Sequence, residues 1–150
     1  MGDIASFTSI RNVLWSGDNI IFMTATNALK AGMVVEIAAT GVDFAVNKAV
    51  KESGASPVGV ALYDTAAGSL AAIATIGCIV YVANADDTTT IDAGDYLITD
   101  DNTVGGTVST SIAVGTDPTQ QKVVGIAIDD IAASGTGRCL ITLGHHTDHA

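Results

Sequence analysis

Basic residues are scarce in this sequence. It has 6 Lys and Arg against 16 Asp and Glu, which gives a formal net charge of −10 over 150 residues. Proteins that bind nucleic acids or anionic membranes need clustered Lys and Arg to neutralise phosphate groups, and the basic residues here are scattered. We therefore expect neither a nucleic-acid nor a membrane partner, and we expect the acidity to keep the protein soluble at high local density.

Aromatic residues, proline and cysteine are also few. The chain is 5% aromatic and has two Pro and two Cys, whereas 48% of it is hydrophobic and rich in Ala, Val and Ile. Small and β-branched side chains pack well in sheets, so this composition favours an all-β fold in one domain. The first residues lack the continuous apolar run of a secretory signal, and we expect Cys78 and Cys139 to be reduced, buried thiols.

Groups for catalysis are missing from most of the chain. All histidines lie in the last six residues, and we expect residues 145–150 to form a flexible tail. A Ser–His–Asp or Cys–His arrangement would therefore have to recruit that tail. We predict no catalytic residue, no cofactor and no enzyme activity. The histidines are His145, His146 and His149.

Acidic pairs raise an alternative function. Asp–Asp pairs occur at residues 86–87, 100–101 and 129–130, and calcium prefers oxygen ligands. Their spacing does not follow an EF-hand loop and no Glu closes any pair, so we interpret them as turn residues and predict no metal site. A small ligand- or carbohydrate-binding β module with calcium in these loops stays open as the alternative.

Apolar runs between turn signals predict a series of strands. The longest uncharged stretch, Thr65 to Ala85, has the length to span a bilayer. Gly68 and Gly77 interrupt it and no Lys or Arg flanks it closely, so we interpret it as two buried strands. A hairpin turn is predicted at Gly105–Gly106. The expected strands cover residues 19–25, 33–38, 44–50, 58–62, 70–76, 78–82 and 91–98.

One segment occurs twice. PVGVALYDTAAGSLAAIATIG, Pro57 to Gly77, returns as VVGIAIDDIAASGTGRCLITLG, Val123 to Gly144, with one insertion at Ser134. The Ala-Gly turns at 31–32 and 93–94 repeat at a similar spacing. We therefore expect a compact β-barrel or sandwich-like domain with an internal pseudo-duplication.

The repeated segment carries glycines at matching places. Gly59 and Gly125 lie inside apolar strands, where the missing Cβ lets another backbone approach closely. This pattern predicts a scaffold role, because neither copy carries a reactive group.

The first 18 residues follow a different pattern. Apolar side chains recur at roughly three-residue spacing, which fits neither a regular strand nor a capped helix. We expect residues 1–18 to form an extended arm that packs on a neighbour or on its own domain, and residues 19–144 to form a single β domain. Trp15 suits a core position and an interface anchor equally. The candidate partner-binding residues are Ile4, Phe7, Ile10, Val13 and Trp15.

The order of the motifs resembles that of a known family. An Ala-Gly turn with an apolar run (AGMVVEI) is followed by PVGVAL and AAGSLAAIATIGCIVYV, then by a second turn (AGDYLI), VVGIAI and GTGRCLITLG. Over residues 25–144 this order is similar to that of the small capsid decoration, or cement, proteins of tailed bacteriophages.

The resemblance implies a function and a partner. Such proteins are β-rich, bind the outer face of an assembled head, often as trimers, and have no enzyme activity. It therefore implies a structural virion protein on the capsid exterior, made in the host cytoplasm, that stabilises the head. The partners it implies are the major capsid protein and further copies of the chain in a homotrimer, with residues 1–18 contributing to capsid contact.

Overall fold

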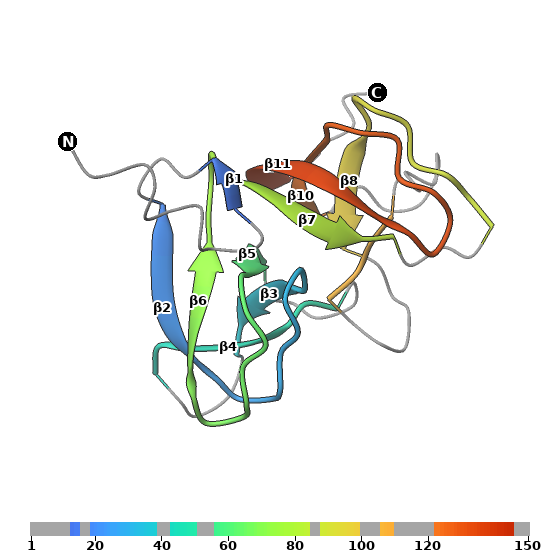
Figure 1. The fold of residues 1–150 in the computed structure, drawn as a ribbon. Coiled ribbons are helices and arrows are strands. Elements are labelled where there is room, and N and C mark those ends of the chain that lie inside the picture. Colours follow the sequence, from blue (N-terminus) through green and yellow to red (C-terminus); the bar gives the residue numbers. More distant parts are fainter. Residues whose placement is uncertain are drawn as a thin grey trace.

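The fold consists of a barrel and a second sheet. The computed structural model describes residues 13–15, 19–38, 43–50, 56–84, 88–99, 106–109 and 122–145, and every regular element in these ranges is a β-strand. Strands β2 to β6 close into the barrel in the order β2-β4-β3-β5-β6 (Figure 1). Their bounds are β2 Ile20–Ala25, β3 Val34–Ile37, β4 Ala45–Lys48, β5 Pro57–Ala61 and β6 Leu70–Ala74.

The second sheet lies beside the barrel (Figure 1). Its strands follow the order β1-β7-β11-β10-β8-β9, and neighbouring strands are antiparallel. The all-β prediction is therefore confirmed. The bounds are β1 Val13–Trp15, β7 Ile79–Ala83, β8 Tyr96–Thr99, β9 Val108–Ser109, β10 Lys122–Ala127 and β11 Thr136–His145.

Strands β7 to β11 repeat the pairing of β2 to β6 in the same register. In the β5–β6 hairpin Val60 pairs with Ala74, and in the β10–β11 hairpin Ile126 pairs with Leu140. The other strand pairs correspond in the same way. The internal duplication is therefore present in the structure as well as in the sequence. Pairs of corresponding residues in the two repeats include Ile21 and Val80, Lys30 and Asp92, Gly32 and Gly94, Met33 and Asp95, Val34 and Tyr96, Phe44 and Gly106, Leu62 and Ile128, and Asp64 and Asp130.

Each repeat contains one parallel backbone contact between two of its own segments. In the barrel, Ala25 of β2 pairs in parallel with Val46 of β4. In the second sheet an isolated parallel bridge joins the counterparts Asn84 and Val108. The second sheet therefore has the strand order of the barrel, with β1 added along β7 and a single bridge in place of the β2–β4 pairing.

The hairpin turns have the same length in both repeats, so the insertion expected at Ser134 is wrong. The amides of Ser69 and Gly135 each close their turn by donating to the carbonyl three residues earlier, at 3.1 and 2.9 Å. The residues just before them, Gly68 and Ser134, have φ angles of 81° and 54°. Ser134 therefore has the left-handed backbone of Gly68, whereas the sequence comparison matches Gly68 with Gly135.

Two apolar cores divide the side chains. Neighbouring residues in a strand point to opposite faces, so Val35 faces the barrel interior whereas Val34 faces the second sheet. The barrel interior holds Met23, Ala25, Leu29, Val35, Val46, Ala61, Ala71 and Ile73. The larger core joins the outer face of the barrel to the inside of the second sheet and includes Val34, Val60, Leu62, Val80, Leu97, Ile131, Cys139 and Ile141.

Gly106 ties the two parts together through the backbone. Its amide donates to the carbonyl of Ala49 and its carbonyl accepts from the amide of Val34, each at 2.8 Å. The strands before and after the turn predicted at Gly105–Gly106, β8 and β9, pair antiparallel with Thr99 opposite Val108. Of that turn only Gly106 lies among the described residues, and it contacts the barrel.

The long uncharged stretch forms strands β6 and β7, as predicted. β6 is largely buried, whereas in β7 only Val80 and Val82 are buried and Tyr81 is exposed. Within the ranges that the structure describes, no helix has the length and apolar character needed to cross a membrane.

Candidate functional site

Two of the candidate partner-binding residues of the arm lie at the edge of the second sheet. Val13 and Trp15 belong to β1, whose backbone pairs antiparallel with β7 at Val80 and Ile79. The end of the predicted arm therefore contacts its own domain. Ile4, Phe7 and Ile10 lie outside the described residues, so their role stays a prediction.

The acidic pair Asp129–Asp130 is used for local structure. Asp129 accepts two hydrogen bonds from the Arg138 guanidinium, which lowers the pKa of its carboxyl group. Asp130 accepts from the amide of Ala93 at 2.9 Å. Among the described residues, no three His, Cys, Asp or Glu side chains form a group that could hold a metal ion. The pairs at 86–87 and 100–101 lie outside those residues.

In the barrel, the Asp64 carboxylate makes the contact that corresponds to the one between Asp130 and the Ala93 amide. It accepts from the amide of Ala31 at 3.0 Å and from Lys30 Nζ at 3.0 Å. The backbone hydrogen bond and then the Lys30 hydrogen bond lower the pKa of the Asp64 carboxyl group. In the second sheet Asp92 replaces Lys30, so the repeated feature is the bond from carboxylate to backbone amide, which holds the Ala-Gly turn on the hairpin.

Both cysteines are buried. Cys78 and Cys139 are free and buried, and burial raises the pKa of the Cys139 thiol to about 12. The thiolate is the reactive form, so Cys139 stays protonated and inert near neutral pH.

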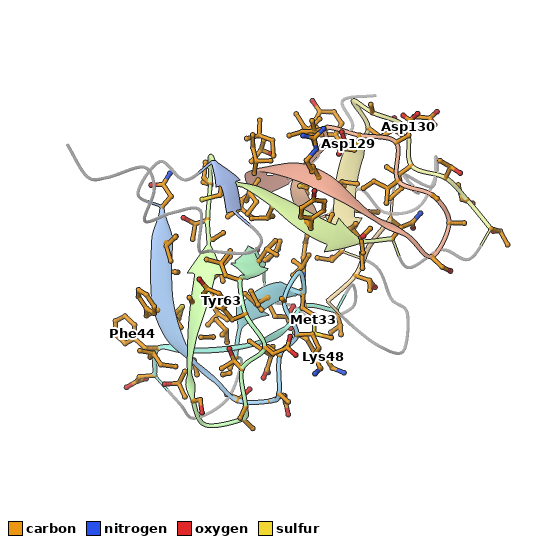
Figure 2. The ribbon with its side chains drawn as sticks, in the orientation of Figure 1. Met33, Phe44, Lys48, Tyr63, Asp129 and Asp130 are labelled. Atoms are coloured by element: carbon orange, nitrogen blue, oxygen red, sulfur yellow. The ribbon has the colours of Figure 1, made fainter. Side chains whose placement is uncertain are left out.

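The surface features that stand out are exposed apolar side chains. Phe44 is 81% exposed and projects outward beside β2, on the barrel and away from Asp129 and Asp130 (Figure 2). Sequence reasoning assigned strands to these segments without deciding which faces would stay uncovered, so it missed this group. The exposed large apolar residues are Ile21, Phe22, Ile37, Phe44, Tyr63, Leu70, Ile76, Tyr81, Tyr96 and Ile128.

A fold of two matched β repeats, with exposed apolar surfaces and an inert thiol, has the character of a binding scaffold. A family model described as phage cement protein matches residues 14–143. The chain therefore belongs to the phage cement protein family. It has a structural role at the phage capsid and is a virion component bound to the capsid exterior, as the resemblance implied.

The fold has a solved relative. The chain is similar to the N base of the head fiber gp8.5 of bacteriophage phi29, with 19% sequence identity and a TM-score of 0.54. The match covers 85% of this chain and 98% of that one, so it extends over both repeats. No curated protein sequence matches the chain significantly.

Proposed function

We propose that the chain is a cement subunit that binds the major capsid protein on the outside of the assembled head as a homotrimer. Membership of the phage cement protein family supports this proposal, and it is the observation that carries it. A protein that binds only the assembled shell stabilises the shell by mass action. A binding free energy of about −8 to −10 kcal/mol per site gives high occupancy at micromolar concentration.

The N-terminal segment is proposed as part of the capsid contact. Residues 1–18 form the arm in this proposal, residues 19–144 the single β domain and residues 145–150 the tail. Arms of three subunits that engage one capsid site together add avidity without new contacts. The apolar residues proposed for this contact are Ile4, Phe7, Ile10, Val13 and Trp15.

The proposed function involves no catalysis. The protonated, buried thiol of Cys139 and the use of Asp64, Asp129 and Asp130 in turns and an ion pair support this view. The protein then acts by binding alone.

Sedimentation with purified heads tests the proposal. Expanded heads that lack the cement protein are mixed with the purified chain and pelleted, and the bound protein is counted per head. We expect saturable binding in multiples of three and a higher temperature of head disruption. Protein that stays wholly in the supernatant would contradict capsid binding, and saturation in numbers that are not multiples of three would contradict the trimer.

A further inference from the structure

The two repeats use the same surface in opposite ways. On the outer face of the barrel, Val34 and Leu62 are 0% and 1% exposed because they pack into the core shared with the second sheet. Their counterparts Tyr96 and Ile128 are 47% and 37% exposed. Ile126, the counterpart of the fully buried Val60, is half-buried. The first repeat uses this surface to bind the second repeat. The corresponding surface of the second repeat is left uncovered.

The complementary surface is uncovered on the barrel. In the second sheet, Val80 is 0% exposed within the shared core, and Gly106 is buried against the Met33 side chain of the barrel. In the barrel their counterparts Ile21 and Phe44 are 39% and 81% exposed. We call Ile21 and Phe44 the receiving surface, and Tyr96, Ile126 and Ile128 the seating surface.

Phe44 also has a conformation that its residue type disfavours. Its φ angle is 54°, and that of its counterpart Gly106 is 77°. Left-handed backbone suits glycine, and a bulky residue there is an outlier. Strained residues of this kind concentrate at functional contacts. The barrel therefore keeps an exposed aromatic side chain where the second repeat uses the residue that its backbone favours.

The sizes at the two contacts are exchanged. Inside the chain the large Met33 side chain lies against Gly106, which has none. At the corresponding contact between copies, the counterpart of Met33 is the smaller Asp95 and the counterpart of Gly106 is the larger Phe44. The volume that Met33 fills within the chain would be supplied from the other side by Phe44.

We infer that the receiving surface of one copy binds the seating surface of a second copy, head to tail, in the manner of the contact between the two repeats inside each chain. This inference rests on the homotrimer of the proposed function and specifies the residues that form it. A head-to-tail contact uses two different patches, so it generates a closed ring when the rotation between copies permits. Three copies in such a ring leave neither surface uncovered.

The net charge of the chain affects contact between copies. Each chain carries a formal net charge of −10, so two copies repel each other. The five side chains named for the two surfaces are uncharged, and Asp95 is the acidic side chain that this contact brings against Phe44. Salt screens the repulsion, with a Debye length of about 8 Å at physiological ionic strength. Association between copies is therefore expected to strengthen with salt, whereas binding of a basic partner at these surfaces would weaken.

Two variants, each altered at one surface, test the inference. Phe44→Asp and Ile128→Asp place a carboxylate in the receiving and the seating surface respectively. By light scattering after size exclusion at about 100 µM, the unmodified chain is expected at three times its 15.1 kDa mass, and each variant at the monomer mass. An equal mixture of the variants is expected to form a dimer, because each variant retains the surface that the other has lost.

Leu70→Asp is the matched control. Leu70 is 64% exposed, and its counterpart Thr136 is exposed as well, so the contact inside the chain covers neither position. This variant is expected to keep the oligomer. Circular dichroism checks that each variant is folded, and if Phe44→Asp is not, Phe44→Gly removes the side chain while suiting the left-handed backbone.

The outcomes separate this inference from capsid binding. Oligomers that persist in both variants, a mixture that stays monomeric, or a chain that is monomeric at every salt concentration would each overturn the inference. Failure to bind heads by a chain that passes the mixing test would overturn only the capsid contact.

Discussion

Gly59 and Gly125 occupy the same position in the two repeats, and each lies directly against the backbone of the adjacent strand. A Cβ at Gly59 would collide with the carbonyl oxygen of Ala74, and one at Gly125 with that of Leu140, both well inside the 3.0 Å that real Cβ atoms keep. The close approach predicted from the sequence is therefore confirmed, and the twice-used segment requires glycine for steric reasons.

Replacing either glycine with alanine is expected to destabilise the fold. Because the obstacle is a backbone atom, the strand has to shift, and overpacking of this kind costs about 1–3 kcal/mol. Urea unfolding of Gly59→Ala and Gly125→Ala measures the loss. Gly144→Ala serves as the control, because nothing lies within 4 Å of a Cβ there; a similar loss in all three variants would contradict the steric explanation.

The Asp64 carboxylate is expected to contribute stability that acid removes. Its pKa is lowered in the folded state by the Ala31 amide and by Lys30, so the contribution is present above the ordinary value of 3.8 and is lost as pH falls through the folded pKa. Asp64→Asn should lower the melting temperature at pH 7, and the difference should close in acid.

Lys30→Met separates the two causes of this shift. It removes the exposed ion pair but keeps the Ala31 hydrogen bond, so its effect should be smaller than that of Asp64→Asn and should disappear in high salt. An effect of Lys30→Met equal to that of Asp64→Asn would show that the ammonium, rather than the amide, holds the turn.

Cys139 is expected to resist thiol reagents while the protein is folded. With a pKa of about 12, its thiolate fraction at pH 8 is about one in ten thousand, and burial also blocks the reagent. A chromogenic disulfide reagent should modify neither thiol in the native protein and both in guanidinium. Rapid native modification of Cys139 would contradict the burial described above and reopen a role for cysteine chemistry.

Truncation of the arm is expected to weaken head binding without unfolding the β domain. Deleting residues 1–12 leaves β1 in place, whereas deleting residues 1–18 also uncovers β7 at Ile79 and Val80. Both truncated chains should keep their β spectrum and bind heads less tightly than the full chain. Unchanged head binding by both would eliminate the arm as a capsid contact.

The sequence predicts most strands because their apolar residues alternate with small or polar ones. In β5, Val60 and Ala61 face different cores, and this arrangement leaves a readable pattern. The duplication can also be recognised in the sequence, since both hairpins contain the dipeptides Val-Gly and Ala-Ala. The alignment of the two turns fails at Ser134 because this serine adopts the left-handed φ of Gly68. A serine in a sequence does not indicate a left-handed backbone.

The contacts between elements far apart in the chain were not predictable from the sequence. β1 is three residues long with an irregular register, which is too short for a period to emerge. The exposure of Tyr96 depends on which repeat covers the other, since its buried counterpart Val34 has the same strand position. A local pattern carries no information about that choice.

The core shared by the barrel and the second sheet has a consequence for the origin of the chain. A domain of about 60 residues buries only about 60% of its unfolded surface and is marginally stable alone, and here Val34 and Leu62 are covered only because another repeat packs on them. A single-repeat ancestor would have left these side chains exposed, and a second copy packed on them would have covered them. Gene fusion would then have made that second copy permanent, at a fixed ratio and independent of protein concentration.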